Sequence, residues 1–276
     1  MKHLIAAAFL LGAAITGLSA PRAEAAAPPT GTPVLLPRAH AHNDYLHDRP
    51  LLDALSWGFC SVEADIWLVD GALLVAHERG SVDPRRTLEA LYLRPLWERF
   101  QANHGSIYPE AAPFTLLIDI KNTGADTFRA LDRVLASYDA MLTHFTDDST
   151  TPGAVTVIVS GERDVKVILG SSPRRAGIDG RLADLDGPLN RNQMPLVSDN
   201  WLLQFRWNGR GALSAADAAK LAATVAKAHQ RGMRVRFWSI PQTEAVWSAL
   251  YDAGVDLLNA DDLGGLNAVL SKKSGE

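Results

Sequence analysis

Short apolar runs alternate with helix-like segments along most of this chain of 276 residues. We expect strands at 34–39, 60–67, 73–76, 115–120, 154–159, 176–178, 195–198, 233–239 and 255–259. We expect helices at 50–57, 87–102, 125–140, 162–169, 214–231 and 242–253. Alternation of this kind makes consecutive strands parallel, with a helix as each crossover. About eight such units predict an α/β fold, a (β/α)8 TIM barrel, as a single domain over residues 34–272.

An open, doubly wound sheet is the alternative fold. It is the usual scaffold for dinucleotides, which bind at a Gly-x-Gly-x-x-Gly loop after the first strand. No such loop follows residues 34–39, and the barrel is therefore favoured.

The first residues have the layout of a secretory signal peptide. A basic start precedes the apolar residues 4–18, and the sequence AEA at 23–25 offers a cleavage site. We expect residues 1–25 to be removed, residues 26–33 to form a flexible leader, and the mature protein to be periplasmic or extracellular. A membrane anchor is the alternative, but the apolar stretch is shorter than the ~20 residues that a spanning helix needs.

Net charge, apolar length and cysteine content limit what the protein can bind or form. The formal net charge is -4, so no overall basic field attracts nucleic acid. No later stretch is long and apolar enough to predict a transmembrane segment in the mature chain. Cys60 is the sole cysteine, which rules out a disulfide within the chain and indicates a packed core residue.

Glu63 and Asp65 stand two positions apart in a predicted strand. Side chains at i and i+2 of a strand point the same way. Two carboxylates about 6 Å apart repel by about 3 kcal/mol at an effective dielectric constant near 20. The pair therefore requires a neighbouring cation, either a divalent metal ion or a basic side chain.

Further polar residues follow the ends of predicted strands. His40, His42 and Asn43 lie at the end of the first strand, and His77 follows the strand at 73–76. In a barrel, groups at the carboxyl ends of the strands meet at one mouth, where active sites form. We expect His40 to orient His42 or to contact metal or substrate.

Asp119 and Lys121 repeat the i, i+2 spacing on the strand at 115–120. Asp119 can complete an oxygen-donor site with the other carboxylates, as Ca²⁺ or Mg²⁺ prefers, and Lys121 can face a phosphate. Trp238 is expected to form a wall of the substrate pocket. Asp261 and Asp262 are expected to be helix-capping groups. Other residues expected to line the pocket are Arg163, Asp199, Asn200 and Trp201.

Together these residues resemble the superfamily of glycerophosphodiester phosphodiesterases and phosphatidylinositol-specific phospholipases C. The similarity is carried by AHNDY (41–45), VEADIWLVDGALLVAH (62–77), LLIDIK (116–121) and the block at 235–263. The Glu-x-Asp pair followed by a strand and a histidine is its most specific part.

The resemblance implies that His42 and His77 form an acid–base pair. It also implies that Glu63, Asp65 and Asp119 bind a divalent cation. Asn43 stands where eukaryotic phospholipases C have an asparagine that is a metal ligand. Glycerophosphodiesterases have there the arginine of a His-Arg-Gly motif, which this chain lacks.

The sequence thus predicts an exported, metal-dependent phosphodiesterase that acts on a small-molecule or lipid phosphodiester. Two alternatives stay open. The sequence His40-Ala41-His42 also suits a zinc metallohydrolase barrel, which needs further histidines at later strand ends, and the chain could be a non-catalytic secreted binding barrel. The sequence predicts no oligomeric state.

Overall fold

A computed structural model of the protein describes residues 31–275. The predicted signal peptide, residues 1–25, lies outside the described residues. Of the predicted leader, only residues 31–33 are described, and they belong to no helix or strand.

Eight parallel strands close into a barrel within residues 31–275, as the sequence predicts. They are, in chain order, β1 (Leu36–Ala41), β2 (Phe59–Val69), β4 (Phe114–Ile120), β7 (Val155–Gly161), β8 (Ala176–Gly180), β9 (Leu196–Asn200), β10 (Arg234–Trp238) and β11 (Leu257–Ala260). The ring closes because β1 pairs in parallel with both β11 and β2. Closure leaves no free edge strand in the ring.

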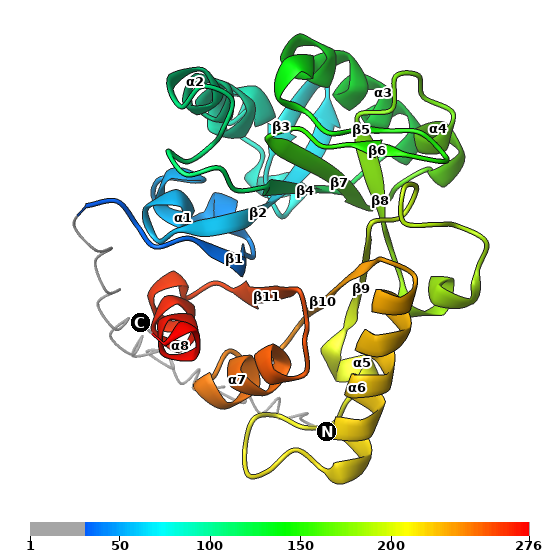
Figure 1. Ribbon diagram of the computed structural model, residues 1–276. Helices are drawn as coiled ribbons and strands as arrows, with labels where there is room; N and C mark the ends of the chain where they lie inside the picture. The colour runs from blue at the N-terminus through cyan, green and yellow to red at the C-terminus, as the bar shows by residue number, and fades with distance from the viewer. Residues whose placement is uncertain (1–30, 276) are drawn as a thin grey trace, which may run out of the picture.

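Helices surround the strands on the outside (Figure 1). They are α1 (Leu52–Ser56), α2 (Arg94–Ala102), α3 (Gly124–Leu135), α4 (Val165–Leu169), α5 (Trp201–Gln204), α6 (Ala215–Gln230), α7 (Glu244–Asp252) and α8 (Leu263–Ser274). A π-helical turn, Glu89–Leu93, precedes α2 in the segment expected to be one helix. After β8, a short 3₁₀ helix (Leu182–Asp186) takes the place of an α-helix.

The predicted strand at 73–76 is not a barrel strand. It forms β3 (Ala72–Val75), which pairs antiparallel with the last residues of the long strand β2. This hairpin extends beyond the barrel at its carboxyl end and places His77 at the mouth. A second hairpin, β5 (His144–Phe145) with β6 (Thr150–Thr151), also lies outside the barrel.

The interior of the barrel is divided into an apolar and a polar layer. Leu117, Ile158, Leu196 and Leu257 are buried together inside the ring as a cluster of their own. Large apolar side chains between strands and helices form the main core. Because the four residues fill the lower part of the barrel, the polar residues that follow them along the strands face the mouth.

Strand β1 begins and ends two residues later than predicted. As a result His40 lies within the strand and His42 follows directly after its last residue. This shift decides which histidine is buried and which reaches the mouth. None of the helices in residues 31–275 is long and apolar enough to cross a membrane.

Candidate active site

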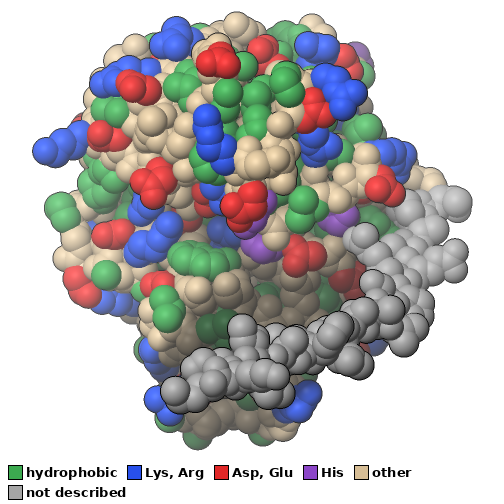
Figure 2. Space-filling view, turned by 180° about the vertical axis from the view of Figure 1, so that it is seen from behind, with side chains coloured by type: hydrophobic (Ala, Val, Ile, Leu, Met, Phe, Trp, Pro, Cys, Tyr) green, Lys and Arg blue, Asp and Glu red, His purple; other side chains and the backbone are tan. Residues whose placement is uncertain are grey.

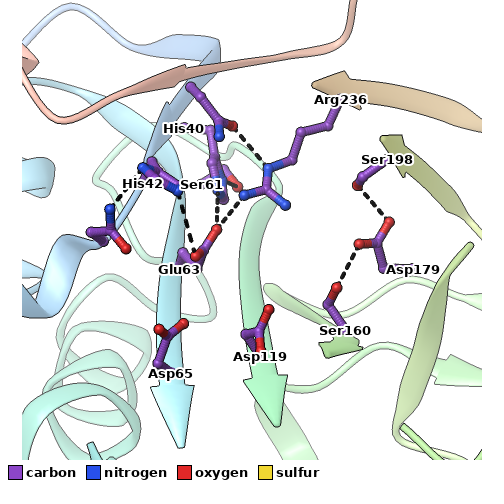
Figure 3. A network of polar contacts seen from close by, with 12 residues as sticks. His40, His42, Ser61, Glu63, Asp65, Asp119, Ser160, Asp179, Ser198 and Arg236 are labelled. Carbon is purple, nitrogen blue, oxygen red and sulfur yellow. Dashed lines mark hydrogen bonds and ion pairs between the residues drawn. The ribbon is translucent and has the colours of Figure 1, made fainter. Parts of the chain in front are cut away.

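The predicted site residues meet at the carboxyl end of the barrel, on β1, β2, β4 and the loops that follow them. Figure 3 shows His42 and Glu63 facing one another, with Asp65 and Asp119 further along neighbouring strands. Figure 2 shows histidine side chains at the surface among acidic ones. Asp65 and Asp119 are direct partners in the pairing of β2 with β4, which brings these two carboxylates together.

His42 is held by a carboxylate on one side of its ring. Its Nδ1 lies 2.8 Å from Oδ1 of Asp261, and its Nε2 lies 3.9 Å from Oε1 of Glu63. Burial lowers the pKa of His42, but the hydrogen bond to Asp261 and the charge of Glu63 outweigh it, so the pKa is raised above its usual value. If Nδ1 is protonated and donates to Asp261, then Nε2 is left to exchange a proton with a substrate.

His77 has the same kind of support from a different carboxylate. Its Nδ1 lies 2.9 Å from Oδ2 of Asp65 and 3.1 Å from the hydroxyl of Tyr45. The side chain of His77 is 53% exposed, whereas that of Asp65 is completely buried. A fixed acid therefore orients an accessible imidazole.

Asn43 and Tyr45 connect the two histidines. The Asn43 amide nitrogen lies 2.9 Å from Nδ1 of His42, and its carbonyl oxygen accepts a hydrogen bond of 2.6 Å from Tyr45. The Tyr45 hydroxyl also lies 2.6 Å from Oδ2 of Asp65. Asn43 has a φ of 50°, a left-handed conformation that asparagine tolerates better than most residues.

Lys121 lies between two carboxylates. Its Nζ is 2.8 Å from Oδ2 of Asp65 and 3.3 Å from Oδ1 of Asp119. Burial and the charge of Glu63 raise the pKa of Asp65. Burial also raises the pKa of Asp119 to about 6, although Lys121 opposes the shift. The two carboxylates thus share one ammonium group, and burial disfavours the charged form of both.

Glu63 forms a buried ion pair with Arg236, which is on the opposite side of the barrel interior (Figure 3). Burial raises the pKa of Glu63, but the charge of Arg236 and the hydrogen bond from His40 outweigh it and hold the pKa well below its usual range. The Nε of Arg236 also donates to Asn259 at 2.8 Å. Glu63 is therefore ionised and fixed.

His40 lies below the mouth and is completely buried. Its Nδ1 is 2.7 Å from the Ser61 hydroxyl and its Nε2 is 3.4 Å from Oε2 of Glu63. Burial and the charge of Arg236 lower its pKa to about 4. The expectation that His40 contacts metal or substrate is therefore wrong for this structure, because both ring nitrogens face protein side chains and the neutral imidazole positions Glu63.

Trp238 is half-buried at the end of β10, where it was expected to form a pocket wall. The guanidinium carbon of Arg181 lies 4.9 Å from the centre of its ring. On the opposite side of the mouth, a hollow of about 410 Å³ is lined by Tyr45, His77 and Arg86, among others.

A divalent cation has a partial donor set here. Within residues 31–275, no three histidine, cysteine, aspartate or glutamate side chains are arranged to hold a metal ion as they stand. However, Oδ1 of Asp65 is buried without a hydrogen-bond partner. That free oxygen and the raised pKa of Asp119 suit a hard cation that prefers carboxylate ligands. The oxygen donors present here therefore fit a divalent cation, and Lys121 neutralises part of the charge of Asp65 and Asp119.

Two residues of this site, Tyr45 and Arg236, were not singled out from the sequence, and Asp261 was expected in a different role. Asp262 caps α8 as expected, since its side chain accepts from the Gly265 amide. The expectation for Asp261 was wrong, because its carboxylate bonds to His42 instead. Arg236 could have been found from its spacing, since it lies two residues before Trp238 and thus on the same face of the strand.

The zinc-hydrolase alternative requires further histidines at later strand ends of the barrel, and neither His144 nor His229 stands at one. His144 lies in the outer hairpin and bonds to Asp139. His229 lies on α6 and bonds to Asp256. Both bond to carboxylates outside the mouth, so neither adds to the His-x-His motif.

The structure is a closed parallel (β/α)8 TIM barrel with two carboxylate-supported histidines at its mouth, and solved structures of phosphodiesterases have the same fold. A glycerophosphodiester phosphodiesterase from Parabacteroides distasonis has the same fold, with a TM-score of 0.53 and 13% identity over 86% of this chain and 98% of that one. One from Agrobacterium tumefaciens gives 0.51, at 13% identity over 86% of this chain and 100% of that one.

Residues 32–177 match the AIM6-like phosphodiesterase domain, and the chain belongs to this family. Altered inheritance of mitochondria protein 6 of Eremothecium gossypii is 31% identical over 83% of this chain and 68% of its own length. The homolog in Arthroderma benhamiae is 28% identical over 81% of each chain. The similarity therefore extends beyond the matched domain into the second half of the barrel.

Proposed function

We propose that this protein is an exported, cation-dependent phosphodiesterase that cleaves glycerophosphodiester or phospholipid-type phosphodiesters. The observation that carries the proposal is the matched support of two histidines. The Nδ1 atoms of His42 and His77 each lie within 2.9 Å of a carboxylate oxygen. This leaves two Nε2 atoms for proton transfer at one barrel mouth.

Hydrolysis of a phosphodiester needs a base for the nucleophile and an acid for the leaving alkoxide. In our proposal one of the two histidines removes a proton from water or a substrate hydroxyl, and the other protonates the leaving oxygen. Asp261 and Asp65 stabilise whichever imidazole becomes positively charged. Proton transfers of this kind contribute typically about 10² to 10⁴ in rate each.

Glu63, Asp65 and Asp119, with the Asn43 carbonyl, would hold Ca²⁺ or Mg²⁺. When bound, the cation would neutralise the charge that develops on the phosphoryl oxygens. Lys121 contributes a positive charge beside the same carboxylates and would contact a nonbridging oxygen. Tyr45 keeps Asn43 and Asp65 in place through its hydroxyl.

Support for the substrate class comes from the fold and the family. The solved structures with the same fold are titled glycerophosphodiester phosphodiesterases. Trp238 at the mouth would form an apolar wall for a glycerol or acyl portion of the substrate. Export rests on the signal-peptide pattern of residues 1–25, and N-terminal sequencing of the exported protein should find residue 26 first.

The test is a screen of glycerophosphodiesters, phosphoinositides and lysophospholipids with Ca²⁺, Mg²⁺ or a chelator. For the best substrate, His42→Ala and His77→Ala should each lower kcat by about 100-fold or more, because each removes a proton-transfer group. Circular dichroism checks the fold. His144→Ala, on the outer hairpin, is the matched control and should keep the wild-type rate.

Near-normal rates in both variants would remove the acid–base assignment. A complete lack of turnover in the screen would instead favour the non-catalytic binding barrel, and ligand binding without turnover would then be the remaining activity to measure.

A further inference from the structure

Two arginines at the barrel mouth have no part in the proposed proton transfers. Arg163 follows β7 by two residues, and Arg181 directly follows β8. Strands β7 and β8 are neighbours in the barrel, so both arginines start from adjacent carboxyl ends.

Arg163 lies near the active site because Gly161, two residues before it, is close to Asp119. A Cβ atom placed on Gly161 would lie 2.3 Å from Oδ1 of Asp119, so the Asp119 carboxylate rests against the end of β7. Gly161 also has a φ of +71°, which favours glycine. Arg163 comes two residues later and has Asp119 among the charges that act on it.

Arg163 is half-buried, and its guanidinium group makes few hydrogen bonds. Within the described residues, its Nε is buried without a hydrogen-bond partner. Its Nη1 donates to the Gly161 carbonyl at 3.3 Å, and neither atom contacts a carboxylate. Burial and the charge of Arg181 lower the pKa of Arg163, although the charges of Asp179, Asp184 and Asp119 oppose the shift. A half-buried guanidinium with few hydrogen bonds, next to the strand end that carries a second arginine, is suited to an anion.

Arg181 is held in place by the barrel interior. Its Nη1 lies 3.2 Å from Oδ2 of Asp179 and 3.1 Å from the Gly180 carbonyl. Asp179 is fully buried and also accepts hydrogen bonds from Ser160 and Ser198. The Arg181 side chain remains 32% exposed, so it is oriented but not enclosed.

The mouth has room for a substituent beside Arg163. A hollow of about 630 Å³ lies between the start of α3 and the loop after β7. Its lining includes Gly124, Arg163 and Lys166, and also Glu162. Arg163 and Lys166 contribute positive charge to this wall, whereas Glu162 and Asp164 contribute negative charge, and Arg181 is not part of it.

We infer that Arg163 and Arg181 form an anion subsite that binds a second negatively charged group of the substrate, a carboxylate or a phosphate monoester on the headgroup. The inference rests on the proposed phosphodiesterase function and narrows its substrate class. The scissile phosphate lies at His42, His77 and Lys121, and the second anion lies beyond Asp119. A neutral headgroup offers the guanidinium of Arg163 no negative charge.

The experiment compares three chromogenic diesters that share one leaving group: 4-nitrophenyl ethyl phosphate, 4-nitrophenyl 2-carboxyethyl phosphate and 4-nitrophenyl 2-phosphoethyl phosphate. The wild-type protein should prefer one or both charged probes over the ethyl ester by about 10-fold or more in kcat/KM, because only these probes form charge-assisted hydrogen bonds with the arginines. The two charged arms distinguish a carboxylate from a phosphate.

Arg163→Gln should lower that preference to within about threefold, and Arg163→Lys should restore part of it. Arg181→Gln is a second variant with the same expected loss, in case the first does not fold. Arg129→Gln is the matched control, since Arg129 is exposed on α3 and pairs with Asp126. Its preference should equal that of the wild type.

Equal kcat/KM values of the wild-type protein for all three probes would overturn the subsite and leave the phosphodiesterase proposal intact. A preference that survives in both Arg163→Gln and Arg181→Gln would overturn it as well. Failure to cleave any probe or natural diester would instead overturn the proposed function.

Discussion

Asp261 and Asp262 are neighbours in the chain, yet their carboxylates bond to different parts of the molecule. Asp261 bonds to the His42 ring and receives a hydrogen bond from Gln242. Asp262 bonds to the Gly265 amide at the start of α8. Asp261 therefore supports an imidazole of the candidate site, whereas Asp262 supports the end of a helix.

Replacing Asp261 with asparagine should lower the pKa of His42. The change keeps the size of the side chain but removes the negative charge and the acceptor that favour the protonated ring. NMR titration of the imidazole signals measures the shift, and kcat should fall by about 10-fold because His42 loses its orientation.

Asp262→Asn is the matched control for this substitution and should leave the His42 titration unchanged. If the His42 pKa stays the same in the Asp261→Asn protein, the carboxylate does not set the charge state of the ring.

Helix α8 shows how a single cap affects a whole element. The Asp262 side chain accepts from the Gly265 amide at 2.9 Å, which satisfies one of the free N–H groups at the helix start. Asp262→Ala should therefore lower the free energy of unfolding by about 1 kcal/mol. Urea unfolding measures the loss, Asp262→Asn should recover most of it, and turnover by the folded protein should not change. An unaltered midpoint in Asp262→Ala would show that packing alone holds α8.

The elements of the barrel could largely be predicted from the sequence, because buried parallel strands are continuous apolar runs and α6 has strong end signals. Helix α8 was missed, since Gly264 and Gly265 stand in its first turn and glycine disfavours a helix. The buried residues Leu263, Leu266, Val269 and Leu270 have helical spacing and were the available signal.

Part of the site could be predicted because its residues are close in sequence. Glu63, Asp65 and His77 belong to one β-hairpin, so their spacing carries the information. The pairs Glu63–Arg236 and His42–Asp261 join residues more than 170 positions apart. Local spacing does not determine such contacts, because they form only when the ring of strands closes and brings the two ends of the chain together.

The distribution of charge in the whole molecule bears on its stability. The site places Glu63, Asp65, Asp119 and Asp261 at one end of the barrel in a protein with a net charge of -4. Arg236 and Lys121 offset part of this charge, and the pKa of Asp119 stays raised to about 6. A cation that binds only the folded state therefore acts on the global unfolding equilibrium through this site.

Millimolar Ca²⁺ or Mg²⁺ should raise the Tm of the wild-type protein by several degrees. At a cation concentration 100 times the Kd, the expected stabilisation is about 2.7 kcal/mol, and each kcal/mol shifts the Tm of a domain of this size by about 2–4 °C. Thermal unfolding, monitored by circular dichroism, measures the shift in Tm. The Tm of the Asp65→Asn protein should not rise when either cation is added, whatever its Tm without the cation. The substitution removes the buried carboxylate whose Oδ1 is free. NaCl at equal ionic strength controls for screening. A chelator that leaves the wild-type Tm unchanged, together with no response to either added cation, would mean that Lys121 and Arg236 alone neutralise the site.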